Sequence, residues 1–169
     1  MILDSTVEPV LPVLQAIGQI PSGVFIITVG KPGDADAVGT MVSFVQQVAM
    51  EPLYVALAVK QGRALVAALT PGRKFAVNIC HAGDKHVLRC FAKNSQRGPN
   101  AFDGVDTRQL DSGLTILTDA CAYIECEMVR KLEFGADHDL YIALAHDGAL
   151  IGDGDLKPMV HLRQDGSKY

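Results

Sequence analysis

The segment from Gly39 to Asn78 constrains the fold of this chain more than any other part of it. It contains two β-rich runs, a short stretch rich in alanine and leucine that is closed by Pro71 and Gly72, and then a third β-rich run. The links between these pieces are short, and the chain as a whole lacks a repeating strand-helix-strand order. The segment therefore predicts neighbouring strands of an antiparallel barrel with a small helix on its outside.

The rest of the chain extends this pattern. Residues 38–48 are long for one strand, and polar Ser43 lies in their middle, which predicts a bend or bulge. Alternation of apolar and polar residues in 120–134 predicts a half-exposed strand, and Asp84 is placed to cap a helix that turns Phe91 inward. Loop 93–104 is the longest loop. In total we expect about seven strands, at 24–29, 38–48, 53–59, 74–79, 120–134, 140–145 and 159–162, and three short helices, at 10–19, at 63–69 and after Asp84.

No internal repeat, low-complexity tract or interdomain linker interrupts the chain. Its 169 residues, of which 49% are apolar, are enough to bury a core without disulfides or structural metal. We therefore expect residues 1–169 to form one mainly β domain, an antiparallel barrel with short peripheral helices.

Charge and composition exclude several kinds of partner. The net charge of −4 and the pI near 5.7 oppose binding to nucleic acid, and the absence of Trp with 6% aromatic residues leaves little for base stacking. The first twenty residues contain acidic side chains and two prolines but no Lys or Arg, which fits neither a signal peptide nor a membrane span. We expect a cytoplasmic protein without membrane contact, whose four cysteines are reduced thiols.

The turn after the second strand of the 39–78 segment contains Lys60, Gln61 and Arg63. A phosphate group with nearly two negative charges needs cations or convergent amide donors, and the start of a helix offers such donors. The preceding strand supplies small, hydroxylic and apolar residues that suit a flat ring. This order suggests a cradle for flavin mononucleotide (FMN). Without the surrounding pattern, however, Lys60 and Arg63 would more often be solvated surface charges than phosphate ligands.

Cysteine and histidine residues cluster between positions 80 and 90. Thiolate and imidazole are the usual ligands of zinc, but the spacing of Cys80, His81, His86 and Cys90 matches no standard zinc finger. Cys80 and His81 would also alternate between faces if the strand continues. We expect no metal site here.

Several motifs together resemble the flavin reductase-like family, whose fold is the FMN-binding split barrel, a Greek-key barrel. They are PSGVFIITV, GTMVSFVQQVAMEP, VKQGRAL, KFAVNI, FAKNSQRGPNAFDGV, ILTDACAYIECEM, ADHDLYIALA and the terminal SKY, so they cover nearly the whole chain. In detail the chain looks most similar to the C-terminal flavin reductase domain of cyanobacterial diflavin flavodiiron proteins. It departs from the family in having Glu51, Pro52 and Leu53 where relatives have a double proline, and in having fewer side-chain hydroxyls on the flavin strand.

The resemblance implies roles for individual residues. His138, together with Asp137, would stand near the face where nicotinamide enters and is the catalytic candidate, although a loop histidine satisfied by a carboxylate would look the same in the sequence. The residues implied to bind the flavin are Thr40, Met41, Val42, Ser43, Gln46, Gln47, Lys60, Gln61, Arg63, Ala64, Asn78, Cys80 and Phe91.

The resemblance also implies an activity. It is that of an NAD(P)H-dependent flavin oxidoreductase, which binds FMN, with FAD or riboflavin as alternatives, and receives hydride from NADH or NADPH at flavin N5. The family is usually homodimeric and can serve a monooxygenase or another electron acceptor. The alternative is a non-catalytic module that holds flavin or haem as a carrier or sensor. Its formal haem ligands would be His81, His86, His146 and His161.

Overall fold

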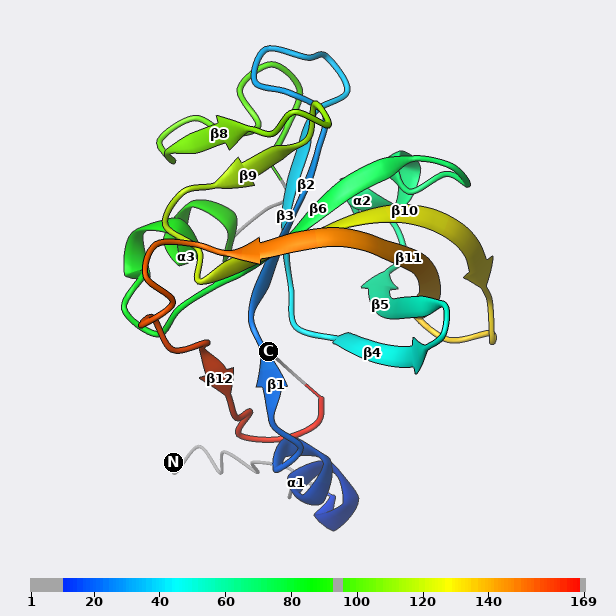
Figure 1. Ribbon diagram of the computed structural model, residues 1–169. Coiled ribbons are helices and arrows are strands. Elements are labelled where there is room, and N and C mark those ends of the chain that lie inside the picture. The colour runs from blue at the N-terminus through cyan, green and yellow to red at the C-terminus, as the bar shows by residue number, and fades with distance from the viewer. Residues whose placement is uncertain (1–10, 93–95, 168–169) are drawn as a thin grey trace, which may run out of the picture.

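The computed structural model describes residues 11–92 and 96–167. Of Gln96 it describes the backbone alone. A curled antiparallel sheet dominates this part of the chain, with strand order β4-β5-β11-β10-β6-β2-β3-β7 (Figure 1). Its strands are β2 (Phe25–Val29), β3 (Val38–Val42), β4 (Val45–Met50), β5 (Leu53–Lys60), β6 (Lys74–Ile79), β7 (Gln96–Arg97), β10 (Ala122–Leu132) and β11 (His138–Leu150).

Two residues, Ser43 and Phe44, explain why this sheet closes on itself. They alone separate β3 from β4, yet these strands lie near opposite ends of the strand order. The sheet must therefore curl until its two ends meet, and the backbone N–H of Ala58 donates to the carbonyl of Phe44 at 2.9 Å where they do. The split-barrel fold expected from the sequence is confirmed, and so is the bend within 38–48.

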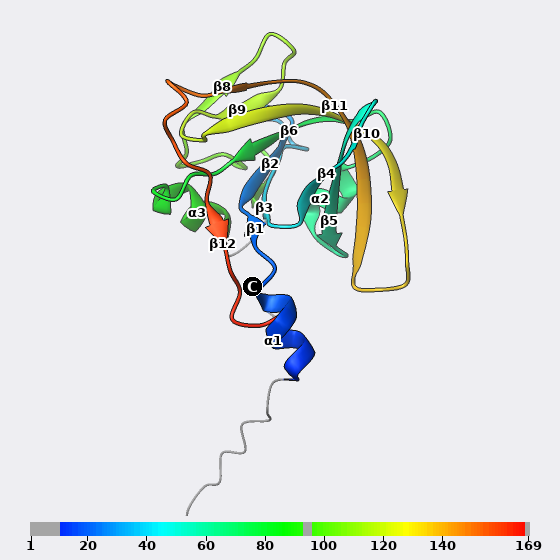
Figure 2. The same ribbon diagram turned by 60° about the horizontal axis from the view of Figure 1, so that its bottom comes forward.

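Smaller elements surround the barrel. Two two-stranded sheets pair β1 (Ser22–Gly23) with β12 (Val160–His161), and β8 (Thr107–Gln109) with β9 (Thr115–Leu117). Both views show α1 projecting below the barrel and α3 beside it (Figures 1 and 2). The three helices are α1 (Pro12–Gly18), α2 (Ala64–Ala68) and α3 (Lys85–Ala92).

The core has two parts because β2 presents both of its faces to packed side chains. Ile27 lies in the barrel interior with Leu57, Phe75 and Tyr141, among others. Ile26, its neighbour, points the other way, into a second cluster under α3 that includes Phe91. As the sequence predicted, the carboxylate of Asp84 accepts a hydrogen bond from the N–H of Val87 at 3.0 Å at the start of α3.

Some details differ from the sequence-based expectations. Twelve strands occur in the described residues instead of about seven, because 38–48 forms two strands and five strands have only two or three residues. The polar face of the strand predicted at 120–134 was expected to be half exposed, but Glu125 on that face is only 5% exposed, and it lines a hollow together with residues 108–112.

The ends of the chain show similar differences. Residues 140–145 belong to the longer β11, whereas 159–162 contribute only the two-residue β12. In α1, Ile17 is 38% exposed and only Gly18 is buried, so this helix stands outside the core. Two parts of the predicted elements lie outside the described residues: Val10, at the start of the helix predicted at 10–19, and residues 93–95 of the loop predicted at 93–104. Within the described residues, no helix is long and apolar enough to cross a membrane.

Candidate functional site

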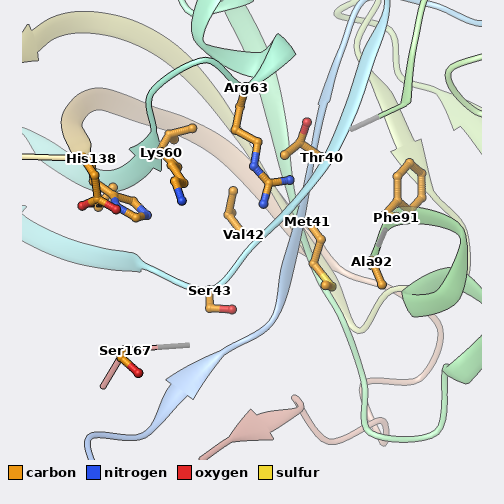
Figure 3. A pocket seen from close by; sticks show the side chains of 13 residues that line it. Thr40, Met41, Val42, Ser43, Lys60, Arg63, Phe91, Ala92, His138 and Ser167 are labelled. Carbon is orange, nitrogen blue, oxygen red and sulfur yellow. Dashed lines mark hydrogen bonds and ion pairs between the residues drawn. The ribbon is translucent and has the colours of Figure 1, made fainter. Parts of the chain in front are cut away.

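A cleft of about 230 Å³ opens where the two ends of the sheet meet, between β3, the end of β5, α3 and the start of β11 (Figure 3). Side chains from segments far apart in the sequence converge on it, because the curl of the sheet brings their strands together. The residues that line it are Thr40, Met41, Val42, Ser43, Ala58, Val59, Lys60, Arg63, Phe91, Ala92, Asp137, His138 and Ser167.

Two cations extend into the cleft from the turn that follows β5. Lys60 is the last residue of β5 and Arg63 immediately precedes α2, and Figure 3 shows both side chains directed toward the same space. Gly62, between them, has a φ of +79°, a backbone conformation that residues other than glycine rarely adopt. Within the described part of the chain, neither Lys60 nor Arg63 forms a salt bridge. This end of the cleft can therefore neutralise an anion.

The wall formed by β3 combines apolar surface with one unsatisfied hydroxyl. Met41 and Val42 contribute apolar area, while Thr40 is 1% exposed and its Oγ1 has no hydrogen-bond partner among the described residues. A buried polar atom without a partner is costly and native proteins rarely tolerate it, so the Thr40 hydroxyl is a candidate hydrogen-bonding group for a ligand at this wall. Ser43, at the bend, adds a second hydroxyl to the same wall.

Helix α3 forms the wall next to β3 and packs directly against that strand. A Cβ atom added to Gly39 would lie 2.3 Å from the ring of Phe91, so only glycine permits this contact. Phe91 is 2% exposed, and it and Ala92 both line the cleft. The glycine in β3 therefore sets the width of the cleft on this side.

His138 and Asp137 occupy the corner at the start of β11. His138 Nδ1 lies 3.0 Å from Asp137 Oδ1, and its ring centroid lies 5.9 Å from that of Phe44. The hydrogen bond to His138 lowers the pKa of the Asp137 carboxyl, so this group is ionised at neutral pH. The guanidinium group of Arg163 also lies over the Phe44 ring, with Cζ 5.1 Å from the ring centroid. The corner thus combines an aromatic surface with an imidazole held by a carboxylate.

The C-terminal segment reaches the cleft through Ser167, and its contact with α1 requires two glycines. Gly166 donates its N–H to the carbonyl of Leu14 at 2.7 Å, and a Cβ atom at Gly166 would lie 2.7 Å from Ile17. Gly18 is equally tight, with the Asp165 backbone 2.8 Å from its Cβ position. Helix α1 thereby fixes where the chain end meets the site.

The structure brings most of the residues implied by the resemblance to the cleft. The lining contains His138, Thr40, Met41, Val42, Ser43, Lys60, Arg63 and Phe91.

The remaining implied residues lie outside the lining of the cleft. Gln46 and Gln47 are exposed on β4 and donate to backbone carbonyls nearby. The Gln61 side chain turns away to Ala136 and Asp139, and Ala64 lines a separate hollow beside α2.

Asn78 and Cys80 are buried inside the protein. The Asn78 amide donates to the Ile26 carbonyl at 2.9 Å and to Thr28 Oγ1 at 3.1 Å, and accepts from the Leu117 N–H at 2.8 Å. These bonds tie β2, β6 and β9 together. Burial raises the pKa of the Cys80 thiol to about 12. Both side chains serve packing in this structure.

Sequence reasoning missed four lining residues, Ala58, Val59, Ala92 and Ser167. Ala58 and Val59 belong to the strand predicted at 53–59, but the pattern that predicts the strand does not show that its end borders a cleft. The terminal SKY motif was a signal for Ser167, but nothing local places a chain end against β3. Lys168 and Tyr169 of that motif lie outside the described residues.

The candidate zinc and haem ligands do not converge. His81 Nδ1 accepts from the Gly83 N–H at 3.1 Å, whereas His86 Nε2 bonds to the Gly104 carbonyl and lies 3.8 Å from Cys90 Sγ. Among residues 11–92 and 96–167, no group of three or more His, Cys, Asp or Glu side chains could hold a metal ion. His146 and His161 lie on β11 and β12, apart from the cleft lining. None of Cys80, Cys90, Cys121 and Cys126 forms a disulfide.

Comparison with known proteins adds independent findings. The family model described as "Flavin reductase like domain" matches residues 17–167. Putative diflavin flavoprotein A 5 of Nostoc sp. is 36% identical over 159 residues, which are 94% of this chain and 27% of that protein. The chain therefore spans about a quarter of the length of the curated relatives it matches.

Solved structures with similar folds include two at 25% identity. One is the NADH:FAD oxidoreductase SgcE6 of Streptomyces globisporus in complex with NAD and FAD fragments, with a TM-score of 0.76 over 90% of this chain and 86% of that one. The other is a homologue of nitrilotriacetate monooxygenase component B from Mycobacterium thermoresistibile, with a TM-score of 0.72 over 89% of this chain and 80% of that one.

Proposed function

This chain belongs to the flavin reductase-like family, and on that premise we propose that it binds FMN in the cleft and transfers hydride from NADH or NADPH to the flavin. The observation that carries the proposal is the pair Lys60 and Arg63, two cations without salt bridges among the described residues at one end of a cleft that also presents the apolar side chains of Met41 and Val42. A dianionic phosphate matches that end, because charge-assisted hydrogen bonds to ionised donors are the strong ones.

The residues present fit a flavin on chemical grounds. Met41 and Val42 offer apolar surface to a flat ring, and the unsatisfied Thr40 hydroxyl offers a hydrogen bond at the same wall. Gln46, Gln47, Gln61, Ala64, Asn78 and Cys80 are not needed for this assignment. Phosphate recognition favours FMN over riboflavin, and FAD, the flavin of the oxidoreductase SgcE6, is the alternative cofactor.

A bound flavin would supply the hydride acceptor, atom N5, so no protein acid or base is required for the transfer itself. The chain's own task is to orient two stacked rings and to exclude water. His138, fixed by Asp137 and packed near Phe44, stands at the open corner and is the candidate to contact the nicotinamide. In this role His138 positions the hydride donor through contact.

The small volume of the cleft and the exposed apolar side chains support a homodimer. Its volume of about 230 Å³ is below the roughly 300–1,000 Å³ usual for ligand pockets. Large apolar side chains are exposed at the start of α1 and on β12, including Leu11 just before α1 at 61%, Val13 at 57% and Val160 at 68%. A second copy would cover such surface and complete the site. Native mass spectrometry checks this, with a dimer as the expected species and a monomer at micromolar concentration as the contrary one.

The biological setting belongs to the same proposal. A structural relative is a homologue of a monooxygenase component, so a monooxygenase or another electron acceptor is the proposed partner. Four free thiols suit a reducing compartment, and we place the protein in the cytoplasm as one domain over residues 1–169.

Anaerobic titration tests the proposed activity. The purified protein loaded with FMN is expected to lose its absorbance near 450 nm on addition of NADH or NADPH and to regain it with air. A flavin colour that persists with both nucleotides would indicate a carrier instead, and a Soret band in the isolated protein would indicate haem. Either result would overturn the proposed reductase.

A further inference from the structure

We propose that Asp139 is a positioning residue that acts through Gln61 to hold Lys60 and Arg63 at one anion site, an inference that rests on the proposed FMN site. The starting observation is that Gln61, although it follows Lys60 directly, does not line the cleft. Its side-chain amide instead donates to the Ala136 carbonyl and to Asp139 Oδ1, each at 3.1 Å.

Asp139 bridges two elements with its two oxygens. Oδ1 accepts from Gln61, while Oδ2 lies 3.0 Å from Lys131 Nζ on the adjacent strand β10. Lys131 is also bound by Glu133, at 2.6 Å, and Asp139 is 2% exposed. The hydrogen bond from Lys131 lowers the pKa of the Asp139 carboxyl, so Asp139 is an ionised acceptor at neutral pH. A buried, ionised and doubly bonded carboxylate is a rigid anchor.

The turn needs such an anchor because regular pairing stops where the turn begins. The ladder between β5 and β11 ends with Lys60 opposite His138. Beyond this pair, two backbone hydrogen bonds hold the turn. The Gln61 N–H donates to the Asp137 carbonyl at 2.9 Å, and the Arg63 N–H donates to the Lys60 carbonyl at a longer distance of 3.4 Å. Gly62 is open on its outer side, with nothing within 4 Å of its Cβ position. The Gln61 side chain therefore adds two tethers to the few backbone bonds that hold the turn.

The consequence concerns phosphate recognition specifically. If the turn loosens, Lys60 and Arg63 are no longer held at positions from which both can contact one phosphate. The affinity for FMN then falls, while the wall on β3 that contacts the ring is unchanged. Riboflavin has the same ring without the phosphate. The ratio of the FMN and riboflavin dissociation constants thus distinguishes a positioning role from general structural damage, because general damage would weaken the binding of both ligands.

The experiment compares Gln61→Ala with the exposed strand residue Gln109→Ala, which lies on β8 outside the cleft. Both ligands are titrated by flavin fluorescence, and folding is checked by thermal melting. For Gln61→Ala we expect the FMN preference to fall about tenfold, as two lost side-chain hydrogen bonds would allow, with riboflavin binding changed less than about twofold. Gln109→Ala should behave as wild type.

Variants of Asp139 complete the test. Asp139→Ala removes one of the two side-chain hydrogen bonds of Gln61, so it should lose part of the FMN preference that Gln61→Ala loses, and the double variant should lose no more than Gln61→Ala, because Asp139 acts through Gln61. Asp139→Asn keeps only one acceptor oxygen for the two donors Gln61 and Lys131, so it should restore the preference only in part. If Asp139→Ala does not fold, the exposed Gln61→Ala variant decides alone.

Equal losses for the two ligands, or no loss, in Gln61→Ala would overturn the positioning role while leaving the proposed reductase intact. A wild-type protein that binds FMN and riboflavin equally would overturn the phosphate assignment itself, and this inference with it.

Discussion

Lys60 and His138 lie directly opposite each other in the antiparallel pairing of β5 with β11. Opposed residues of an antiparallel pair have Cβ atoms about 4.5–5.5 Å apart, so a cation and an imidazole are neighbours on one face of the sheet. Both line the cleft. This register brings the proposed phosphate end and the proposed nicotinamide corner together.

Arg63→Ala should weaken FMN binding about tenfold and leave riboflavin binding nearly unchanged, because a charge-assisted contact to phosphate contributes on the order of 1.5–3 kcal/mol, less when solvent-exposed. Fluorescence titration measures both constants. The matched control is Arg130→Ala, an exposed arginine on β10 outside the cleft lining. A parallel loss for both ligands would contradict the phosphate role of Arg63.

Thr40→Val should raise the stability of the ligand-free protein by about 1 kcal/mol, because it removes a buried hydroxyl without a partner among the described residues. The same change should weaken flavin binding several-fold. Thr28→Val is the contrasting control, since Thr28 is also buried but its hydroxyl donates to Thr115 and accepts from Asn78. It should destabilise by about 1–3 kcal/mol. Urea unfolding checks both; destabilisation by Thr40→Val would argue against an unsatisfied hydroxyl.

Gly39→Ala should displace α3, because the new Cβ would meet the Phe91 ring. Overpacking of this kind costs about 1–3 kcal/mol, and flavin affinity should fall as Phe91 and Ala92 move. Phe91→Leu combined with Gly39→Ala should recover part of both losses by vacating the contact. Thermal melting and titration measure the effects, and an undisturbed Gly39→Ala protein would show that α3 does not depend on this contact.

Stability should fall at alkaline pH. Burial raises the pKa of the Cys80 and Cys126 thiols to about 12 from the usual 9.0. Between these values the unfolded chain loses protons that the native protein keeps, so the free energy of unfolding decreases as pH rises, by roughly 1.4 kcal/mol per pH unit for each thiol.

Urea unfolding between about pH 8 and pH 11 measures that slope. Cys126→Ala should remove the contribution of one thiol from the slope. A stability that stays level across this range would contradict the assigned burial of the thiols.

Much of the fold could be predicted from local patterns. The β2–β3 hairpin, the bend at Ser43 and the helix capped by Asp84 each depend on residues close in the sequence. The buried position of Glu125 could not be predicted, because residues 108–112, with which it lines one hollow, come from another part of the chain. Exposure of Ile17 likewise depends on where α1 sits relative to the barrel.

The site was predicted less completely than the fold, for a physical reason. Residues within one segment, such as Thr40 to Ser43 or Lys60 to Arg63, are brought together by the chain itself. Asn78 and Gln61 are polar residues in the right segments, but each is used by backbone and side-chain partners that are distant in sequence. A pattern cannot tell a polar side chain that binds a ligand from one that ties strands together.

The most direct test of the central claim is a crystal structure of the protein with FMN. We expect density for the isoalloxazine ring along Thr40 to Ser43 and for the phosphate within hydrogen-bond distance of Lys60 and Arg63. Density for the nucleotide at another surface, or a phosphate turned away from both cations, would contradict the account.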